Sequence, residues 1–178
     1  MKLPKILVVF LLLALGLPAQ AASRQEIDVY VDEALREFRQ HTSAGATLAS
    51  RASGMLVFPK VYKAGFGIGG EYGEGVLRIG GRNVAYYSTA AASIGLQAGA
   101  QRKSQIILFM TDAALNKFRA SKGWEVGVDG SVALADMGAG EAIDSQTLKQ
   151  PIIGFIFSNE GLMFNLNLEG SKITPIVR

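Results

Sequence analysis

A glycine-rich run from Gly65 to Gly81 constrains the fold of this 178-residue chain more than any other feature. Eight of its seventeen residues are glycine, and five of the six up to residue 75 stand at odd positions: Gly65, Gly67, Gly69, Gly73 and Gly75. Residues two apart in a strand face the same side, so one face would be nearly bare backbone. The other face would carry Phe66, Ile68, Tyr72 and Val76. A bare face lets another sheet, a helix or a ligand approach the main chain closely.

Residues 1–21 have the features of a cleavable signal peptide. Lys2 and Lys5 precede an apolar stretch of 12 residues, and an Ala-x-Ala cleavage motif ends at Ala21. The apolar stretch is short for a membrane span. We therefore expect cleavage after Ala21, a periplasmic or secreted product that is peripheral to a membrane, and a single domain at residues 22–178. An uncleaved N-terminal anchor is the alternative.

Composition and charge exclude several classes of site. The chain contains no cysteine, which excludes disulfides, thiolate metal sites and a cysteine nucleophile. Residues 22–178 hold 16 basic and 15 acidic residues, a net charge of +1. The positive charge is concentrated in residues 38–111, which hold eight Lys or Arg and two acidic residues. This middle segment is expected to attract anions, whereas a near-neutral exported chain gives no reason to expect nucleic acid as a partner.

Local patterns predict an α+β fold. Residues 23–26 form a capping box that starts an N-terminal amphipathic helix running to about Gln40. Thr111 is placed to cap a mid-chain helix that stops at Gly123, and a weaker helix is expected over 46–52. Short strands are predicted at 55–58, within the glycine run, and at 83–87, 93–100, 105–110, 131–135, 152–157 and 162–168. Because no βαβ rhythm is present, the sheet should be mostly antiparallel and strongly curved or barrel-like.

Motifs that would indicate an enzyme are missing or incomplete in the sequence. Gly65-x-Gly67-x-x-Gly70 matches the letters of the dinucleotide fingerprint, but no helix follows it and no acidic residue stands about 20 positions on. His41 is the only histidine, and without an acid nearby in sequence it is better explained as a helix-end residue than as a catalytic base. No acidic cluster has the spacing of a calcium loop. We expect no enzymatic activity, no cofactor and no metal.

Basic residues beside apolar ones remain as the candidate site. Four of them flank the glycine strand, two more lie in a later predicted turn, and two aromatic residues of the strand would add apolar contact, with Tyr62 beside them. We predict that they share one site for an anionic head group; the alternative is that they are scattered surface charges. The set comprises Lys60, Lys63, Arg78, Arg82, Arg102, Lys103, Phe66 and Tyr72.

Four segments carry a family resemblance. They are GMLVFPKVYKAGFGIGG at residues 54–70 with YGEGVL at 72–77, and the segments 95–101, 126–133 and 159–173. Together they resemble the SYLF domain family, also called the yeast actin-binding domain family, which has many exported bacterial members. The resemblance covers nearly all of residues 22–178 and implies a lipid-binding module. Eukaryotic members bind phosphoinositides, and some bind or bundle actin, partly through a basic amphipathic N-terminal helix.

The predicted N-terminal helix departs from that pattern, because it carries five acidic residues against three arginines, a poor charge for an anionic membrane. We therefore expect the lipid contact at the basic middle segment, and we do not expect actin as a partner of an exported chain. The predicted function is non-enzymatic binding of anionic phospholipid or phosphoinositide-like head groups at the envelope membrane surface. The alternative is a structural or protein-interaction component of the cell envelope with no lipid ligand, in which the glycine face is packed core.

Overall fold

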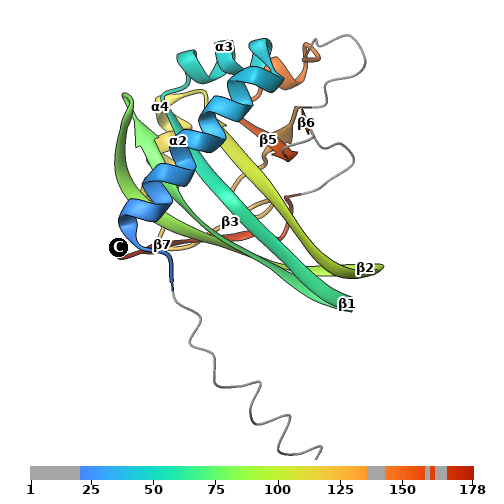
Figure 1. Cartoon of the computed structure of the whole chain (residues 1–178). Helices are drawn as coiled ribbons and strands as arrows, with labels where there is room; N and C mark the ends of the chain where they lie inside the picture. The colour runs from blue at the N-terminus through green and yellow to red at the C-terminus, as the bar shows by residue number, and fades with distance from the viewer. Residues whose placement is uncertain (1–20, 136–142, 159–160, 163–167) are drawn as a thin grey trace, which may run out of the picture.

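The computed structural model describes residues 21–135, 143–158, 161–162 and 168–178; at Phe66, 93–100 and 161–162 it describes the backbone alone. The helices among these residues are α2 (Arg24–His41), α3 (Ser43–Arg51), α4 (Asp112–Ala120) and the 3-10 helix η1 (Thr147–Lys149). The strands are β1 (Gly54–Ile79), β2 (Arg82–Phe109), β3 (Trp124–Glu125), β4 (Ala133–Leu134), β5 (Ile152–Ser158), β6 (Gly161–Leu162) and β7 (Lys172–Ile176). The α+β class predicted from the sequence is confirmed (Figure 1).

Strands β1 and β2 form one long antiparallel hairpin that organises the sheet. The turn Gly80-Gly81 joins them, and both glycines have a positive φ, 57° and 76°, which side chains disfavour. Near this turn β2 also pairs with β7, over residues 86–90, and near its other end it pairs with β5, over residues 104–109. These pairings are antiparallel, whereas the short β4 runs parallel to β5. The result is the curled, half-barrel sheet seen in Figure 1.

The continuity of β1 and β2 differs from the short, separate strands expected between residues 55 and 110. The two strands stay paired along almost their whole length. Their register shifts at three places: Phe58/Val61, Gly65/Gly67 and Leu77/Arg78. Such irregularities bend a strand without ending it. The turn-favouring residues of this segment therefore mark bends in continuous strands rather than strand boundaries.

The glycine run lies where β1 folds back, so that its two halves face one another. A Cβ atom placed on Gly73 would lie 2.7 Å from the carbonyl oxygen of Lys60, and one placed on Gly75 would overlap the carbonyl oxygen of Val57. These facing pairs converge on Gly67, which has a φ of 73° and open space around it. Glycine tolerates this backbone conformation at no steric cost. At Gly73 and Gly75, the bare face predicted from the sequence is thus covered by the first half of β1 itself, whereas at Gly67 it is open.

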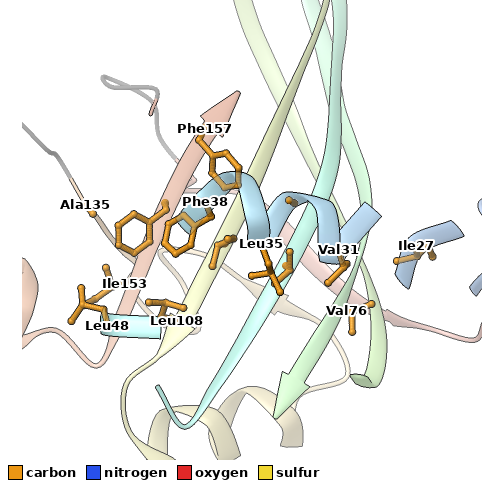
Figure 2. Packing of buried hydrophobic residues seen from close by; sticks show 14 of the residues in the cluster. Ile27, Val31, Leu35, Phe38, Leu48, Val76, Leu108, Ala135, Ile153 and Phe157 are labelled. Atoms are coloured by element: carbon orange, nitrogen blue, oxygen red, sulfur yellow. The ribbon is translucent and has the colours of Figure 1, made fainter. Parts of the chain in front are cut away.

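Helix α2 packs an apolar stripe against one face of the sheet (Figure 2). The predicted capping box is present at its start: the Ser23 N–H donates to Glu26 Oε2 at 2.8 Å, and the Glu26 N–H donates to Ser23 Oγ at 3.3 Å. Each large apolar side chain buried in this way stabilises the fold by roughly 1.5–3 kcal/mol, so α2 is a fixed part of the core. The stripe comprises Ile27, Val31, Ala34, Leu35 and Phe38.

The opposite face of the sheet carries a second core, which α4 helps to cover. Thr111 caps α4 as predicted, because its Oγ1 accepts a hydrogen bond from the Ala114 N–H at 3.2 Å. The Phe118 ring packs edge-on against Trp124, with centroids 5.7 Å apart, and lies against Phe109 of β2 at 4.8 Å. Burial on both faces explains the continuous apolar sequence at the end of β2.

Other predicted elements have different bounds in the structure. Helix α2 extends one residue beyond its expected end, to His41, and α3 begins before the expected helix at 46–52. Helix α4 ends before Gly123, which was expected to stop it. Of the strand predicted at 131–135, only β4 forms, and most of the strand predicted at 162–168 lies outside the described residues.

Candidate functional site

The six predicted basic residues lie in two groups along the β1–β2 hairpin. We call the fold of β1 around Gly67, with the part of β2 paired to it, the bend end, and we call the end closed by Gly80-Gly81 the turn end. The pairing of Tyr62 with Arg102 and of Val61 with Lys103 brings four residues together near the bend end. These four are Lys60, Lys63, Arg102 and Lys103. The other two, Arg78 and Arg82, lie at the turn end.

At the turn end, Arg78 is held by α2. Its Nη2 lies 2.7 Å from Oδ1 of Asp32, and its Nε donates to Oδ1 of Asn83 at 2.8 Å. One helical turn earlier, Asp28 accepts hydrogen bonds from Asn83 Nδ2 at 2.8 Å and from Tyr86 Oη at 2.7 Å. Burial raises the pKa of the Tyr86 hydroxyl, so it remains a donor at neutral pH. These contacts make the turn end an anchoring point for α2.

At the bend end, Glu71 connects the two halves of the folded hairpin. Its Oε2 lies 2.7 Å from Nζ of Lys103, whose side chain is only 8% exposed. Its Oε1 lies 3.9 Å from Nζ of Lys63, whose side chain is 37% exposed. A buried charge needs a compensating partner. The charge of Lys103 is therefore balanced by Glu71 inside the fold, whereas the side chain of Lys63 remains partly exposed to solvent.

The two remaining cations of the bend end differ in how they are engaged. The Nζ of Lys60 lies 3.0 Å from the centroid of the Tyr30 ring of α2, a cation–π contact. The Arg102 side chain is exposed, and no hydrogen bond or ion pair joins its guanidinium to any described residue; the same holds for the guanidinium of Arg82 at the turn end. A guanidinium without a protein partner can bind phosphate or carboxylate in bidentate geometry.

The predicted aromatic residue Tyr72 is half-exposed on β1. Its hydroxyl donates to Glu74 Oε1 at 2.9 Å, and Glu74 also pairs with the guanidinium of Arg178. Burial of the ring, and then the hydrogen bond to Glu74, raises the pKa of Tyr72, so the hydroxyl stays protonated at neutral pH. Tyr62 is exposed to a similar extent. The side chain of Phe66 lies outside the described part of the chain.

The bend carries no ionisable residue. Residues 64–70 of β1 and 90–101 of β2 contain no Asp, Glu, Lys, Arg or His. Within the described ranges, the stretch of β2 between its contacts with β7 and β5 pairs with β1 alone. Figure 1 shows the paired strands extending beyond the other elements, and Ile68 in the bend is 78% exposed. Lys63 and Arg102 flank this uncharged projection.

Two adjoining cavities lie between α2 and the hairpin near the bend end. The smaller, of about 230 Å³, is lined by Glu33 and Glu37 of α2 and by basic residues of the hairpin. The larger, of about 630 Å³, is lined mainly by aromatic and apolar residues, including Tyr62 and Tyr72. The residues that line both cavities are Tyr30, Pro59 and Lys60.

The acidic residues of α2 belong to the site in a way that sequence reasoning missed. Asp28 and Asp32 contact the turn end, whereas Glu33 and Glu37 line the smaller cavity. The members of each pair are four residues apart, which places them on one side of a helix. This spacing is visible in the sequence and could have identified both pairs. Because the apolar stripe between the two flanks is buried against the sheet, α2 presents no apolar face to a membrane.

Within the described ranges, no group of His, Asp or Glu side chains is arranged to hold a metal ion. The ring of His41 lies near Phe157, with centroids 6.4 Å apart. None of the helices in the described part of the chain has the length and apolar character needed to cross a bilayer.

A family model described as Ysc84, Las17-binding protein actin regulator, matches residues 90–176. The match begins within β2 and includes three of the four segments that carried the resemblance, those at 95–101, 126–133 and 159–173. No curated protein matches the chain significantly.

Proposed function

Because the chain belongs to the Ysc84 (SYLF) family of lipid- and actin-binding domains, we propose that it binds anionic phospholipid at a membrane surface and catalyses no reaction. The contact is made by the bend end of the hairpin. The uncharged bend enters the interface, and the partly exposed Lys63 and the exposed Arg102 bind lipid phosphates. Phosphoinositide-like head groups, which carry more phosphate, belong to the same ligand class.

The observation that carries this proposal is an exposed, uncharged bend with cations on either side. Exposed apolar surface of this kind commonly marks a site of contact with a protein or a membrane. At a bilayer, the half-exposed rings of Tyr62 and Tyr72 suit the head-group level, where aromatic residues gather. Each Lys or Arg near an anionic surface contributes about 1 kcal/mol, so Lys63 and Arg102 would give binding that weakens as salt rises.

The other residues of the predicted site have different parts in this proposal. Lys60 and Lys103 are engaged within the fold, and they shape the bend end more than they touch the bilayer. Phe66 belongs to the bend by its position in the sequence. Arg78 anchors α2, and Arg82 lies at the turn end, outside the proposed contact.

The site of action proposed here is the cell envelope, after removal of residues 1–21. The family description names Las17 binding and actin regulation, and an exported chain would not meet those partners, which favours lipid. N-terminal sequencing of the protein from its native source should give a chain beginning at Ala22. A chain that retains Met1 in the mature protein would contradict the proposal of export by cleavage.

Co-sedimentation with vesicles tests the lipid contact. The protein should pellet with phosphatidylcholine vesicles in proportion to added phosphatidylglycerol, and less at high salt. The double variant Lys63→Ala/Arg102→Ala should lose about tenfold or more in partitioning. The control Arg119→Ala/Lys149→Ala removes the same charge from exposed positions elsewhere and should behave as the wild type.

Two results would overturn this proposal. One is pelleting that does not depend on phosphatidylglycerol, and the other is an equal loss in the control variant. A folded protein that pellets with no vesicle, and that retains a stable envelope partner in pull-down, would instead favour the protein-interaction alternative.

A further inference from the structure

The smaller cavity beneath α2 brings opposite charges to its two sides without joining them. Glu33 and Glu37 line it from α2, and Lys60 and Arg102 line it from the hairpin. In the described part of the chain, neither glutamate forms an ion pair, and Arg102 has no polar partner. Opposite charges that face one space, and do not reach each other, can be bridged by a ligand carrying both charges.

The charges around this cavity distinguish three classes of ligand. A purely anionic group would gain Arg102 but would face two carboxylates, and Lys103 adds little because Glu71 already neutralises it. A purely cationic group would gain the carboxylates but would face Arg102 and Lys60. A zwitterion with a phosphate and an ammonium group can satisfy both sides at once, since electrostatic complementarity is a source of specificity.

The larger cavity adds an apolar volume beside this polar one. Its volume of about 630 Å³ lies within the range of roughly 300–1,000 Å³ that is typical of ligand sites. Ile27, Tyr62 and Tyr72 contribute to its lining. Lys60 and Tyr30 line both cavities, so a ligand that spans them would pass the Lys60 ammonium.

The carboxylates of the larger cavity do not oppose an apolar occupant. Glu26 accepts the Ser23 N–H in the capping box, and Glu74 pairs with Arg178 and accepts the Tyr72 hydroxyl. Their charges are thus directed to protein partners, which lowers the cost of bringing an acyl chain close to them.

We propose that the two cavities hold one phosphatidylethanolamine-type lipid. Its phosphate lies at Arg102 and Lys60, its ammonium group at Glu33 and Glu37, and one acyl chain in the larger cavity. This inference rests on the proposed function for the membrane that supplies the lipid, and it adds selectivity for one head group to a surface contact that responds only to charge.

Calorimetric titration with short-chain lipids tests the inference in the absence of vesicles. Dihexanoyl phosphatidylethanolamine, added as monomers, should bind saturably and about tenfold or more tightly than dihexanoyl phosphatidylglycerol. Free O-phosphoethanolamine has the same charges without the chains, and it should bind at least about tenfold more weakly than the lipid.

Paired variants separate the two sides of the cavity. Glu33→Gln/Glu37→Gln should weaken binding of the ethanolamine lipid about tenfold and leave the glycerol lipid unchanged or tighter. Arg102→Gln should weaken both lipids. Asp112→Asn, which removes an exposed acid on α4, serves as the control and should change neither. Glutamine is a good helix former, and the unfolding temperature of each variant reports whether the fold persists.

Each contrary outcome has a distinct meaning. Equal affinity for the two lipids, or an ethanolamine affinity unaffected by Glu33→Gln/Glu37→Gln, would overturn the head-group assignment. Free O-phosphoethanolamine binding as tightly as the lipid would show a soluble zwitterion as the ligand and would overturn the lipid part. Intact pelleting with anionic vesicles, but no binding of the short-chain lipid, would overturn this inference and leave the proposed function standing.

Discussion

The turn end and the bend end of the β1–β2 hairpin are made of the same two strands but have opposite surroundings. At the turn end, Arg78 is bonded to Asp32 of α2, and β7 pairs alongside. At the bend end, no third described strand pairs with the projecting hairpin, and Ile68 faces solvent. The comparison shows that positive charge along one hairpin has two uses. Near the turn, Arg78 fastens a helix, and near the bend, Lys63 and Arg102 reach solvent.

The glycines differ in the same way along β1. Gly73 and Gly75 face the backbone of the first half of the strand, where a side chain has no room, whereas Gly70 has only the carbonyl oxygen of Ala91 at ordinary contact distance. One part of the run is therefore required for the fold, and another part is free to meet a partner.

The largest effect is expected from Gly75→Val. Its Cβ would overlap the carbonyl oxygen of Val57, so the variant should lose about 3 kcal/mol or more of unfolding free energy, or fail to fold. Gly70→Ala is the control, because a Cβ there would lie 3.6 Å from the nearest atom, and it should change stability by less than about 0.5 kcal/mol. Urea unfolding measures both, and equal losses would contradict the fold-back of β1.

A smaller loss is expected when Glu71 is neutralised. Glu71→Gln leaves the Lys103 ammonium buried without a counter-charge, and we expect a loss of about 2 kcal/mol in urea unfolding, within the range of roughly 1–3 kcal/mol for a buried group that loses its partner. The double variant Glu71→Gln/Lys103→Met should recover most of it, since removing the ammonium as well leaves no uncompensated buried charge.

Asp32→Asn breaks the ion pair at the turn end, and its effect on stability is compared with that of Glu71→Gln at the bend end. The Asp32 side chain is 63% exposed, so solvent screens the pair and the loss should stay below about 1 kcal/mol. A larger loss for Asp32→Asn than for Glu71→Gln would contradict the expectation that the ion pair at the bend end contributes more to the free energy of unfolding than the one at the turn end.

The bend and the turn end should respond differently to an added charge. Ile68→Asp should lower affinity for anionic vesicles about tenfold or more, because a carboxylate disfavours both the apolar interface and the anionic surface. Val84→Asp, at another exposed apolar position near the turn, should leave affinity unchanged. Equal effects on flotation with vesicles would show that the bend is not the preferred contact.

The smallest effect concerns the capping box of α2. Hydrogen bonds from the backbone and then the side chain of Ser23 lower the pKa of Glu26, so the folded state favours the ionised carboxyl. Its contribution is present above the unfolded pKa of about 4.3 and is lost as the pH falls. Glu26→Gln should therefore reduce the urea midpoint slightly at pH 7, and the reduction should shrink as the pH falls below about 4.3. A reduction of the same size at every pH would show that the effect is not electrostatic.

Local signals in the sequence predicted the helices, since caps and apolar stripes depend on residues close in the chain. Ser23 with Glu26 fixed the start of α2, and Thr111 fixed the start of α4. The continuity of β1 was not predictable in the same way, because the sequence does not distinguish a glycine that ends a strand from a glycine that lets the strand fold back. Alternation of the glycines predicted a bare face, but the backbone that packs against it belongs to Lys60 and Val57, which precede the bend in the sequence.

The candidate site was predictable only in part for the same reason. Proximity in sequence grouped Arg78 with Lys63, yet strand direction separates them, and the partner of Arg78 comes from α2. Glu71 pairs with Lys103, 32 positions later, through the folding of the hairpin. Residue type identified the cations, whereas tertiary contacts decided which of them remain exposed.

The central claim is that the bend end, and not the turn end, enters an anionic membrane surface. Since the chain has no cysteine, Ile68→Cys and Val84→Cys can each carry a single environment-sensitive fluorophore. On adding phosphatidylglycerol vesicles, the probe at position 68 should shift its emission to the blue and be quenched by lipids bearing nitroxide groups, while the probe at position 84 should not respond. Equal responses at both positions, or a response at position 84 alone, would contradict the claim.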